Sequence, residues 1–320
     1  MTADEVRAGR EVYRDLLTDM MVHDERIVCL DSDTGLFTSV DFGPAANRYV
    51  NVGIAELNMM GIAAGLARSG RVPVVNTMAT FAVTRALESV KVNVALTGLP
   101  VRIVATHGGL AAGHLGPTHH SLEDLAIMRT LPNVTVVVPA DAGQTRSLFS
   151  EAVATTGPVY FRLGRGATPD LPANLPAARL GEAQTVHHTN RARVTIVACG
   201  PYPVTAALDA AAELEAGGVA VTVLNMHTVK PLDVTALLAA AGSSEVVVTV
   251  EEHWAAGGLG SAVAEVLAEL APVRVIRVAA AGHFFPVAGS QSWLLARAGV
   301  DHNRVVAAAR RGIGEPDSPS

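Results

Sequence analysis

The sequence is poor in aromatic residues, lysine and cysteine. Aromatic residues make up 4% of the 320 residues, and the only lysines are Lys91 and Lys230. The interior must therefore be built mainly from Ala, Val, Gly and Leu. Cys29 and Cys199 are the only cysteines, and each falls in an apolar run typical of a buried strand. We expect two reduced core thiols in a cytoplasmic protein rather than a disulfide framework.

Long apolar runs and clusters of basic residues are missing as well. No apolar run approaches the roughly 18 residues that a membrane span needs. The first 21 residues are charged and amphipathic, which is unlike a signal peptide. The formal net charge is −6 at pH 7, without a basic stretch or interleaved basic and aromatic residues. We therefore expect no binding to nucleic acid or to a membrane.

Three common ligand-binding motifs are also absent from the sequence. No G-x-G-x-x-G follows a strand pattern, and there is neither a P-loop nor a G-x-S-x-G. These absences argue against a dinucleotide-binding protein, a P-loop nucleotidase and a serine hydrolase of the nucleophile-elbow type.

What is present is a regular alternation of strand and helix patterns. Apolar residues make up 49% of the chain and charged residues 17%, which is enough for two sizeable cores. Continuous apolar strands that alternate with helices indicate parallel sheets covered on both faces. Strands are predicted at 26–33, 72–80, 101–109, 134–141, 159–164, 193–200, 219–226, 245–252 and 273–280. In the first half, helices are predicted near 3–22, 54–69, 81–97, 121–130 and 141–155.

The alternation is interrupted once, and the interruption predicts a domain boundary. Residues 167–184 contain three prolines and no periodicity, which is typical of a linker. We therefore predict an α/β fold with two domains, at 1–166 and 191–310, joined by a linker at 167–190. The polar tail at 311–320 is expected to be disordered.

A carboxylate at the start of an apolar helix is the first candidate functional residue. Glu56 stands in "NVGIAELNMMGIAAGLA", residues 51–67, whose small residues predict a tightly packed helix. A buried carboxylate costs several kcal/mol or more unless it is paired or protonated. Such an acid is a catalytic tool, although a first-turn Glu that merely complements the helix dipole explains the position equally well.

Polar residues gather where the predicted strands end, which is where ligands bind in such sheets. Asp31 and Asp33 end the first strand, and "NTMATF" ends the next and leads into Phe81. Arg162 and Arg165 follow the fifth strand. The two arginines are either an anion clamp or a surface pair.

The segment after the third strand is the least ordinary part of the chain. It reads "ATHGGLAAGHLGPTHHSLED" and holds four histidines among glycines and a proline: His107, His114, His119 and His120. Long Gly-rich loops inside compact domains are usually functional, which favours a substrate-binding loop. Surface histidines without a role remain an alternative. Zinc is the weakest interpretation, because the spacing matches no common ligand pattern and no cysteine lies nearby.

Several of these segments together carry a resemblance to a known family. "NVGIAE", the "TF" about 25 residues later, "TH", "GPTHHSLEDLAIMRTLPN" and "VVPAD" resemble the pyrimidine-binding domain in the C-terminal half of transketolase. "VTVLNMHTVKPLD" and "VVTVEEHWAAGGLGSAVAE" resemble the transketolase C-terminal domain, and deoxyxylulose-phosphate synthase shares the same segments. The β subunit of 2-oxoacid dehydrogenases has the same architecture but usually an "HSQS"-like loop in place of "GPTH".

The resemblance implies thiamine diphosphate as cofactor and gives roles to the candidate residues. In the family, the residue matching Glu56 hydrogen-bonds the aminopyrimidine ring and so activates the thiazolium for deprotonation. The remaining roles divide by ligand. The cofactor pocket is completed by Phe81, which stacks on the pyrimidine, and by Asp33 and Ile54. Substrate contacts fall to His107, His114, Leu115, His119, Arg162 and Arg165, with His107 and His119 also moving protons.

The resemblance also implies a missing half. A full-length transketolase has an N-terminal G-D-G…N motif that binds magnesium and the cofactor diphosphate, and no G-D-G occurs here. We therefore expect a split enzyme whose partner, an N-terminal-half transketolase subunit, supplies most magnesium ligands. The expected assembly is a two-plus-two heterotetramer that is active only as a complex.

One departure bears on the substrate. The family loop reads roughly G-E-D-G-P-T-H-Q, whereas this chain has "GHLGPTHH", so Leu115 replaces an Asp that contacts a sugar hydroxyl and His114 replaces the preceding acid. Leu cannot accept a hydrogen bond, so the donor or acceptor is expected to differ from ordinary pentose phosphates. The alternatives are a 2-oxoacid dehydrogenase β subunit, a deoxyxylulose-phosphate-synthase-like enzyme and a non-catalytic scaffold subunit. Retention of Glu56, Phe81, His107 and His119 argues against the last.

Overall fold

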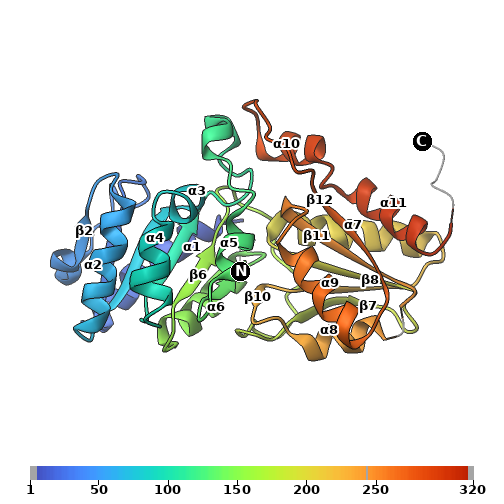
Figure 1. Ribbon diagram of the computed structural model, residues 1–320, viewed down its shortest axis with the longest axis horizontal. Coiled ribbons are helices and arrows are strands. Elements are labelled where there is room, and N and C mark those ends of the chain that lie inside the picture. Colours follow the sequence, from blue (N-terminus) through green and yellow to red (C-terminus); the bar gives the residue numbers. More distant parts are fainter. Residues whose placement is uncertain (1–5, 243, 316–320) are drawn as a thin grey trace.

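The computed structural model describes residues 6–242 and 244–315, which form two sheets that lie side by side in Figure 1. The first sheet has the strand order β10-β5-β6-β4-β3-β1-β2. Neighbouring strands are parallel except β10 and β5. The strands are β1 (Ile27–Asp31), β2 (Tyr49–Asn51), β3 (Val72–Met78), β4 (Arg102–Thr106), β5 (Thr135–Val137), β6 (Val159–Arg162) and β10 (Thr228–Lys230).

Helices cover both faces of this first sheet, as the continuous apolar strands predict. Adjacent strand residues belong to opposite layers: Val74 packs with helix α1 and Val75 with helix α2. The helices are α1 (Gly9–His23), α2 (Glu56–Arg68), α3 (Ala79–Val83), α4 (Leu87–Ser89), α5 (Asp124–Thr130) and α6 (Ala142–Ala154). Short helices are η1 (Gly43–Arg48), η2 (Val90–Ala95), η3 (Gly113–Leu115) and η4 (Pro117–His119).

The second sheet has the order β12-β11-β8-β9-β7 and is parallel except for the β7–β9 pair. Its strands are β7 (Gln184–His188), β8 (Val194–Cys199), β9 (Val221–Asn225), β11 (Val246–Trp254) and β12 (Arg274–Ala280). Its helices are α7 (Pro201–Ala216), α8 (Val234–Ala241), α9 (Leu259–Leu270), α10 (Gln291–Ala298) and α11 (His302–Gly312). The predicted α/β fold with two sheet domains is confirmed.

The boundary between the domains differs from the prediction in two ways. Strand β7 lies inside the expected 167–190 linker and pairs with β9, so the second domain begins before residue 191. Strand β10 comes from the second half of the chain but extends the first sheet through β5. Both strands are short and mixed in polarity, so neither has a clear period-two pattern.

The chain ends also differ from the expectations. The predicted helix at 3–22 begins at Gly9, and positions 3–5 of that prediction lie outside the described residues. Within the predicted tail at 311–320, helix α11 continues to Gly312, and Glu315 accepts a hydrogen bond from Arg193 Nη1 at 3.0 Å. Residues 316–320 lie outside the described part of the chain.

The helix predicted at 81–97 is broken into α3, α4 and the π-helix η2. The hydroxyl of Thr84 donates to the carbonyl of Thr80 at 2.6 Å, a local bond that competes with regular helix geometry. The break places Arg85 in the short turn between α3 and α4, with its side chain 45% exposed.

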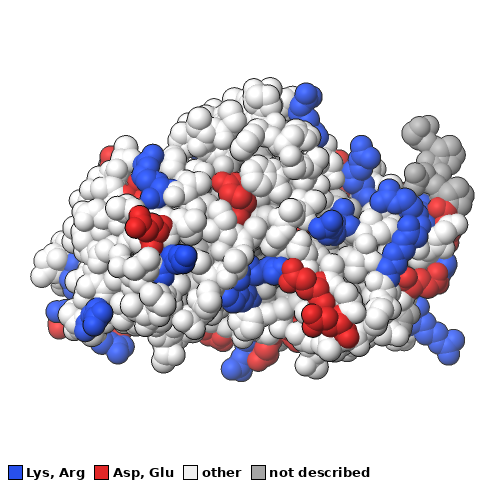
Figure 2. Space-filling model, viewed as in Figure 1, with Lys and Arg blue, Asp and Glu red and all other residues white. Residues whose placement is uncertain are grey.

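The structure bears on the predictions for the cysteines, for membrane-spanning helices and for surface charge. Cys29 and Cys199 are buried, free thiols, as predicted. Within residues 6–242 and 244–315, no helix combines the length and the apolar character required to cross a bilayer. Figure 2 shows acidic and basic residues scattered over one face of the molecule, without a continuous field of either sign.

Candidate active site

The segments that follow four neighbouring strands bring the candidate residues to one edge of the first sheet. Asp33 follows β1, Phe81 follows β3, His107 follows β4 and Arg165 follows β6. These strands are adjacent and parallel, in the order β6-β4-β3-β1. Their carboxyl ends therefore meet at the edge where ligands bind in such sheets.

Glu56 is the first residue of helix α2, and it is buried, with 1% of its surface exposed. Its carboxylate is paired, because Arg85 Nη1 donates to Oε2 at 2.8 Å. The position at the helix start adds a favourable interaction with the helix dipole. The flanking Ile54 and Leu57 are 71% and 49% exposed, so a buried acid lies beneath an apolar rim.

Phe81 is linked to this carboxylate through Arg85 and also contacts His119. The guanidinium carbon of Arg85 stands 4.6 Å from the Phe81 ring centroid, within cation–π range. The His119 ring meets Phe81 edge-on, with centroids 5.3 Å apart and the planes at 80°. Glu56, Arg85, Phe81 and His119 therefore form one continuous series of contacts.

His107 is buried in the same region and has a left-handed backbone conformation, with φ of 59°. Burial, followed by the nearby charges of Arg10, Arg165, His114 and His119, lowers the pKa of His107 to about 4. Its Nδ1 lies 3.0 Å from the hydroxyl of Thr106. His107 is thus a neutral imidazole at pH 7, with one ring nitrogen held by its neighbour.

Arg10 is a candidate that sequence reasoning did not single out. It lies in the first turn of α1, and burial, followed by the charge of Arg165, lowers its pKa. Its Nε is buried and has no hydrogen-bond partner within the described part of the chain. Arg165 is exposed. Two arginines that repel one another beside a neutral His107 suit an anionic ligand.

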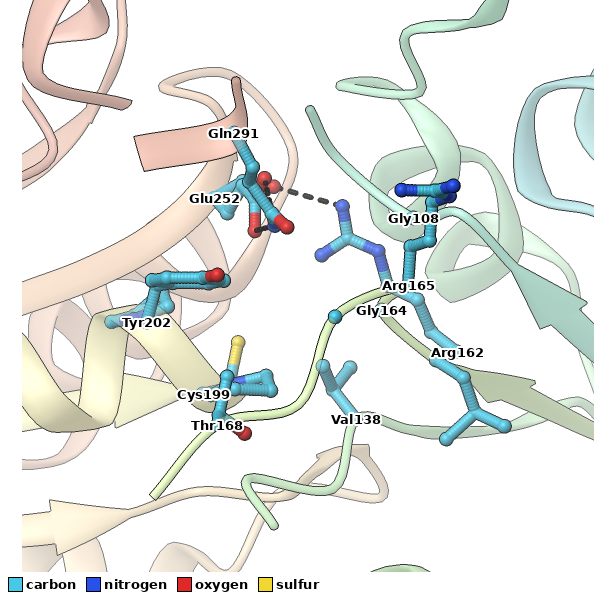
Figure 3. Close-up of a pocket in the computed structure, with 15 residues that line it drawn as sticks. Gly108, Val138, Arg162, Gly164, Arg165, Thr168, Cys199, Tyr202, Glu252 and Gln291 are labelled. Atoms are coloured by element: carbon cyan, nitrogen blue, oxygen red, sulfur yellow. Dashed lines mark hydrogen bonds between the residues drawn. The ribbon is translucent and has the colours of Figure 1, made fainter. Parts of the chain in front are cut away.

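Arg162 has a different environment from the one expected for an anion clamp. It is buried, its Nε lies 2.9 Å from Asp124 Oδ2, and its Nη2 donates to the carbonyl of Glu252 at 2.9 Å. Arg162 lines a pocket whose walls come from both domains, and Figure 3 shows this pocket. A Cβ at Gly108 would lie 2.4 Å from Arg162 Nε, so only glycine fits there. These contacts give Arg162 a structural role. Of Arg162 and Arg165, only the latter is free, within the described part of the chain, to bind an anion.

The second domain supports the loop that carries the four candidate histidines, residues 107–120. Gly289, just before α10, donates its backbone N–H to the carbonyl of Gly113 at 3.0 Å. Figure 1 shows α10 and this loop rising next to each other above the two sheets. His114 and Leu115, at the top of the loop, are both exposed, whereas His120 is buried. The second domain thus positions the loop on which the substrate prediction rests.

The remaining candidates are less enclosed. Asp33 is exposed, has φ of 60° and accepts a hydrogen bond from Asn51 Nδ2 at 3.0 Å. The neighbouring Asp31 is buried and accepts from Asn76 Nδ2 at 2.6 Å, so its part is structural. Across the residues that the structure describes, no group of three or more His, Cys, Asp or Glu side chains could hold a metal ion.

Two family models match the chain, and together they cover most of it. The transketolase pyrimidine binding domain matches residues 6–170, and the transketolase C-terminal domain matches residues 181–305. The second match begins ahead of β7, in agreement with the pairing of that strand in the second sheet.

Relatives of similar length are single subunits of transketolases. The chain is 40% identical over 302 residues to the 6-deoxy-6-sulfo-D-fructose transketolase subunit SqwH of a Clostridium species, covering 94% of this chain and 92% of that protein. It is 41% identical over 282 residues to one subunit of the apulose-4-phosphate transketolase of Phocaeicola vulgatus, covering 86% and 89%. These relatives support a transketolase over a 2-oxoacid dehydrogenase β subunit.

Solved structures agree with the family models. A split-gene transketolase described as an inactive beta4 tetramer has a TM-score of 0.86 and 40% identity, covering 97% of this chain and 99% of that one. A transketolase of Pichia stipitis has a TM-score of 0.80 at 23% identity, which shows a shared fold, and this chain spans 46% of it. With both domain models matched and relatives of the same length at 40% identity, the chain belongs to the transketolase family.

Proposed function

We propose that this chain is the pyrimidine-side subunit of a two-subunit, thiamine-diphosphate-dependent transketolase, active only with its partner. The proposed reaction transfers a two-carbon ketol unit from a ketose or hydroxypyruvate-like donor to an aldehyde or other carbonyl acceptor. The observation that carries the proposal is the buried carboxylate of Glu56, which Arg85 links to the face of Phe81. The family resemblance assigns these two side chains to the aminopyrimidine.

The residues present fit the pyrimidine part of the cofactor. An aromatic face and a carboxylate acceptor offer a stacking surface and a proton-accepting group, and Ile54 adds an exposed apolar contact beside them. When bound, thiamine diphosphate supplies the carbanion chemistry. The part of Glu56 would be to accept a hydrogen bond from the pyrimidine ring, and Asp33 would line the same edge of the sheet.

The diphosphate and magnesium find no such fit among the residues that the structure describes. The described residues contain no carboxylate cluster for the metal, and the sequence has no G-D-G. We propose that an N-terminal-half subunit supplies these contacts. Four exposed apolar side chains on β2 and α2 and between them suit a surface that another chain covers. They are Val50, Ile54, Leu57 and Ile62.

His107 and His119 are the proposed groups for substrate proton transfer. The neutral His107 can donate a hydrogen bond to the donor carbonyl or accept one from a substrate hydroxyl. His119, held by Phe81 and by Thr118 Oγ1 at 2.9 Å, lies close enough for its charge to lower the pKa of His107. We propose that Arg10 and Arg165 bind the anionic end of the donor. Guanidinium groups bind phosphate and sulfonate alike, and the names of the two relatives above refer to a sulfo-sugar and a sugar phosphate.

The experiment for this proposal is reconstitution of the complex. The chain should co-purify with an N-terminal-half transketolase subunit, and the mixture should consume hydroxypyruvate in the presence of thiamine diphosphate and magnesium. Light scattering should give the mass of two copies of each subunit, since closed symmetric assemblies are the default. An active one-to-one complex would contradict the assembly. A stable complex that requires a lipoyl or flavin partner for turnover would contradict the reaction.

Replacement of Leu115 by Asp is expected to change donor preference. Leu115 is 44% exposed on the supported loop and offers no hydrogen bond to a sugar hydroxyl. Leu115→Asp should therefore raise kcat/KM for xylulose or fructose phosphates relative to hydroxypyruvate by about tenfold. Leu115→Met, which keeps an apolar side chain at the same position, is the matched control and should leave the ratio unchanged. If the wild-type complex already prefers the ketose phosphates, Leu115 has no such role.

A further inference from the structure

Arg85 makes two contacts that together resemble those of a bound ring. Its guanidinium lies 4.6 Å from the centroid of Phe81, and the same group donates to Glu56 at 2.8 Å. A guanidinium is planar, delocalised and rich in N–H donors, so it stacks on an aromatic face while donating in its own plane. A pyrimidine ring with one protonated nitrogen offers the same combination of a flat face and an in-plane donor.

The two contacts are the ones that the proposed function assigns to the cofactor pyrimidine, so this inference rests on that function. While Arg85 donates to Glu56 Oε2, a ring nitrogen cannot take the same position at that oxygen, and the guanidinium covers one face of Phe81 on which a ring could stack. We propose that Arg85 is a placeholder for the aminopyrimidine, and that its side chain must swing away from Glu56 before the cofactor is seated.

The position of Arg85 in the fold makes this motion inexpensive. The residue lies in the turn between α3 and α4, and its side chain is 45% exposed, whereas that of Glu56 is 2% exposed. A long side chain at such a turn can rotate toward solvent without moving either helix. Glu56, by contrast, is fixed by burial at the start of α2, so it stays in place to meet the ring.

The placeholder also explains how a carboxylate is kept buried in the chain before assembly. A buried charge without a partner is strongly unfavourable. Arg85 neutralises Glu56 in the chain by itself, and the pyrimidine then takes over the hydrogen bond. The same contact therefore stabilises the separate chain and competes with cofactor binding, and these two effects have opposite signs.

The test measures both effects in Arg85→Met, which retains a long, flexible side chain but removes the charge and the donors. In the separate chain, the thermal midpoint should fall. In the complex with the partner subunit, the Kd for thiamine diphosphate with magnesium, measured by calorimetry, should decrease about tenfold. Arg85→Lys should give intermediate values, because Lys keeps the charge without the planar stack. Arg146→Met, an exposed arginine of α6, is the matched control and should change neither.

Each outcome decides between the placeholder and another role. Tighter cofactor binding with a lower midpoint supports the placeholder. Weaker or unchanged binding in Arg85→Met overturns it and makes Arg85 a residue that supports the bound ring or only the fold. Arg85→Lys serves the same decision if the Met variant does not fold. Failure of the wild-type complex to bind thiamine diphosphate would overturn the proposed function itself, which keeps the two failures distinguishable.

Discussion

Glu56→Gln is expected to slow hydrogen–deuterium exchange at the thiazolium carbon of bound thiamine diphosphate by about a thousandfold, in line with the usual contribution of a positioned acid or base. Gln has the same shape as Glu and can still accept a hydrogen bond. It cannot hold the negative charge that draws a proton to the pyrimidine ring. The exchange rate is read by NMR after acid quench of the reconstituted complex.

Two controls separate this effect from a general loss of structure. Glu88→Gln makes the same change in helix α4, away from the contacts of Glu56, and should leave the exchange rate unaltered. The affinity of Glu56→Gln for the cofactor should stay within a few-fold of the wild-type value, because stacking and diphosphate contacts are retained. Exchange at the wild-type rate in Glu56→Gln would mean that another group activates the cofactor.

Much of the fold follows from the sequence, because buried parallel strands leave a strong local signal. The apolar runs at β1, β3, β4 and β8 are continuous, and every residue of these strands except the two ends of β3 is buried. The short strands β7 and β10 carry no such signal. Each forms a strand because it pairs with a strand that is distant in sequence, and such pairing leaves no local sequence pattern.

The candidate site is predictable where residues lie at strand ends and not where they depend on tertiary contacts. Asp33 ends one predicted strand, His107 lies near the end of another and Phe81 directly follows a third, so their convergence at one sheet edge can be anticipated. Arg85 and Glu56 are 29 positions apart, and the break that exposes Arg85 interrupts a pattern that predicts one continuous helix.

The two arginines at the proposed anion site show the same limit. Arg10 sits in an amphipathic helix far from Arg165 in sequence. The antiparallel bridge between Ala8 and Ala167, together with the packing of α1 against α6, brings the two regions together. Arg162 has the same sequence context as Arg165, yet burial against Asp124 gives it a different part. The catalytic and binding roles of these residues stay predictions until the variants are measured.

Dependence on a partner subunit is expected to have an equally large effect on cofactor binding. This chain offers contacts for the pyrimidine, whereas the diphosphate carries most of the charge of the cofactor. Each charge-assisted hydrogen bond to such a group contributes about 1.5–3 kcal/mol. Loss of several of them, together with the metal, should weaken binding by roughly a thousandfold or more in the separate chain.

The most direct test of the two-subunit account is a set of calorimetric titrations of thiamine diphosphate into this chain, into the partner and into their mixture, with and without magnesium. Tight binding is expected only in the mixture with magnesium, at one cofactor for each pair of subunits. Tight, magnesium-dependent binding by this chain without the partner would contradict it.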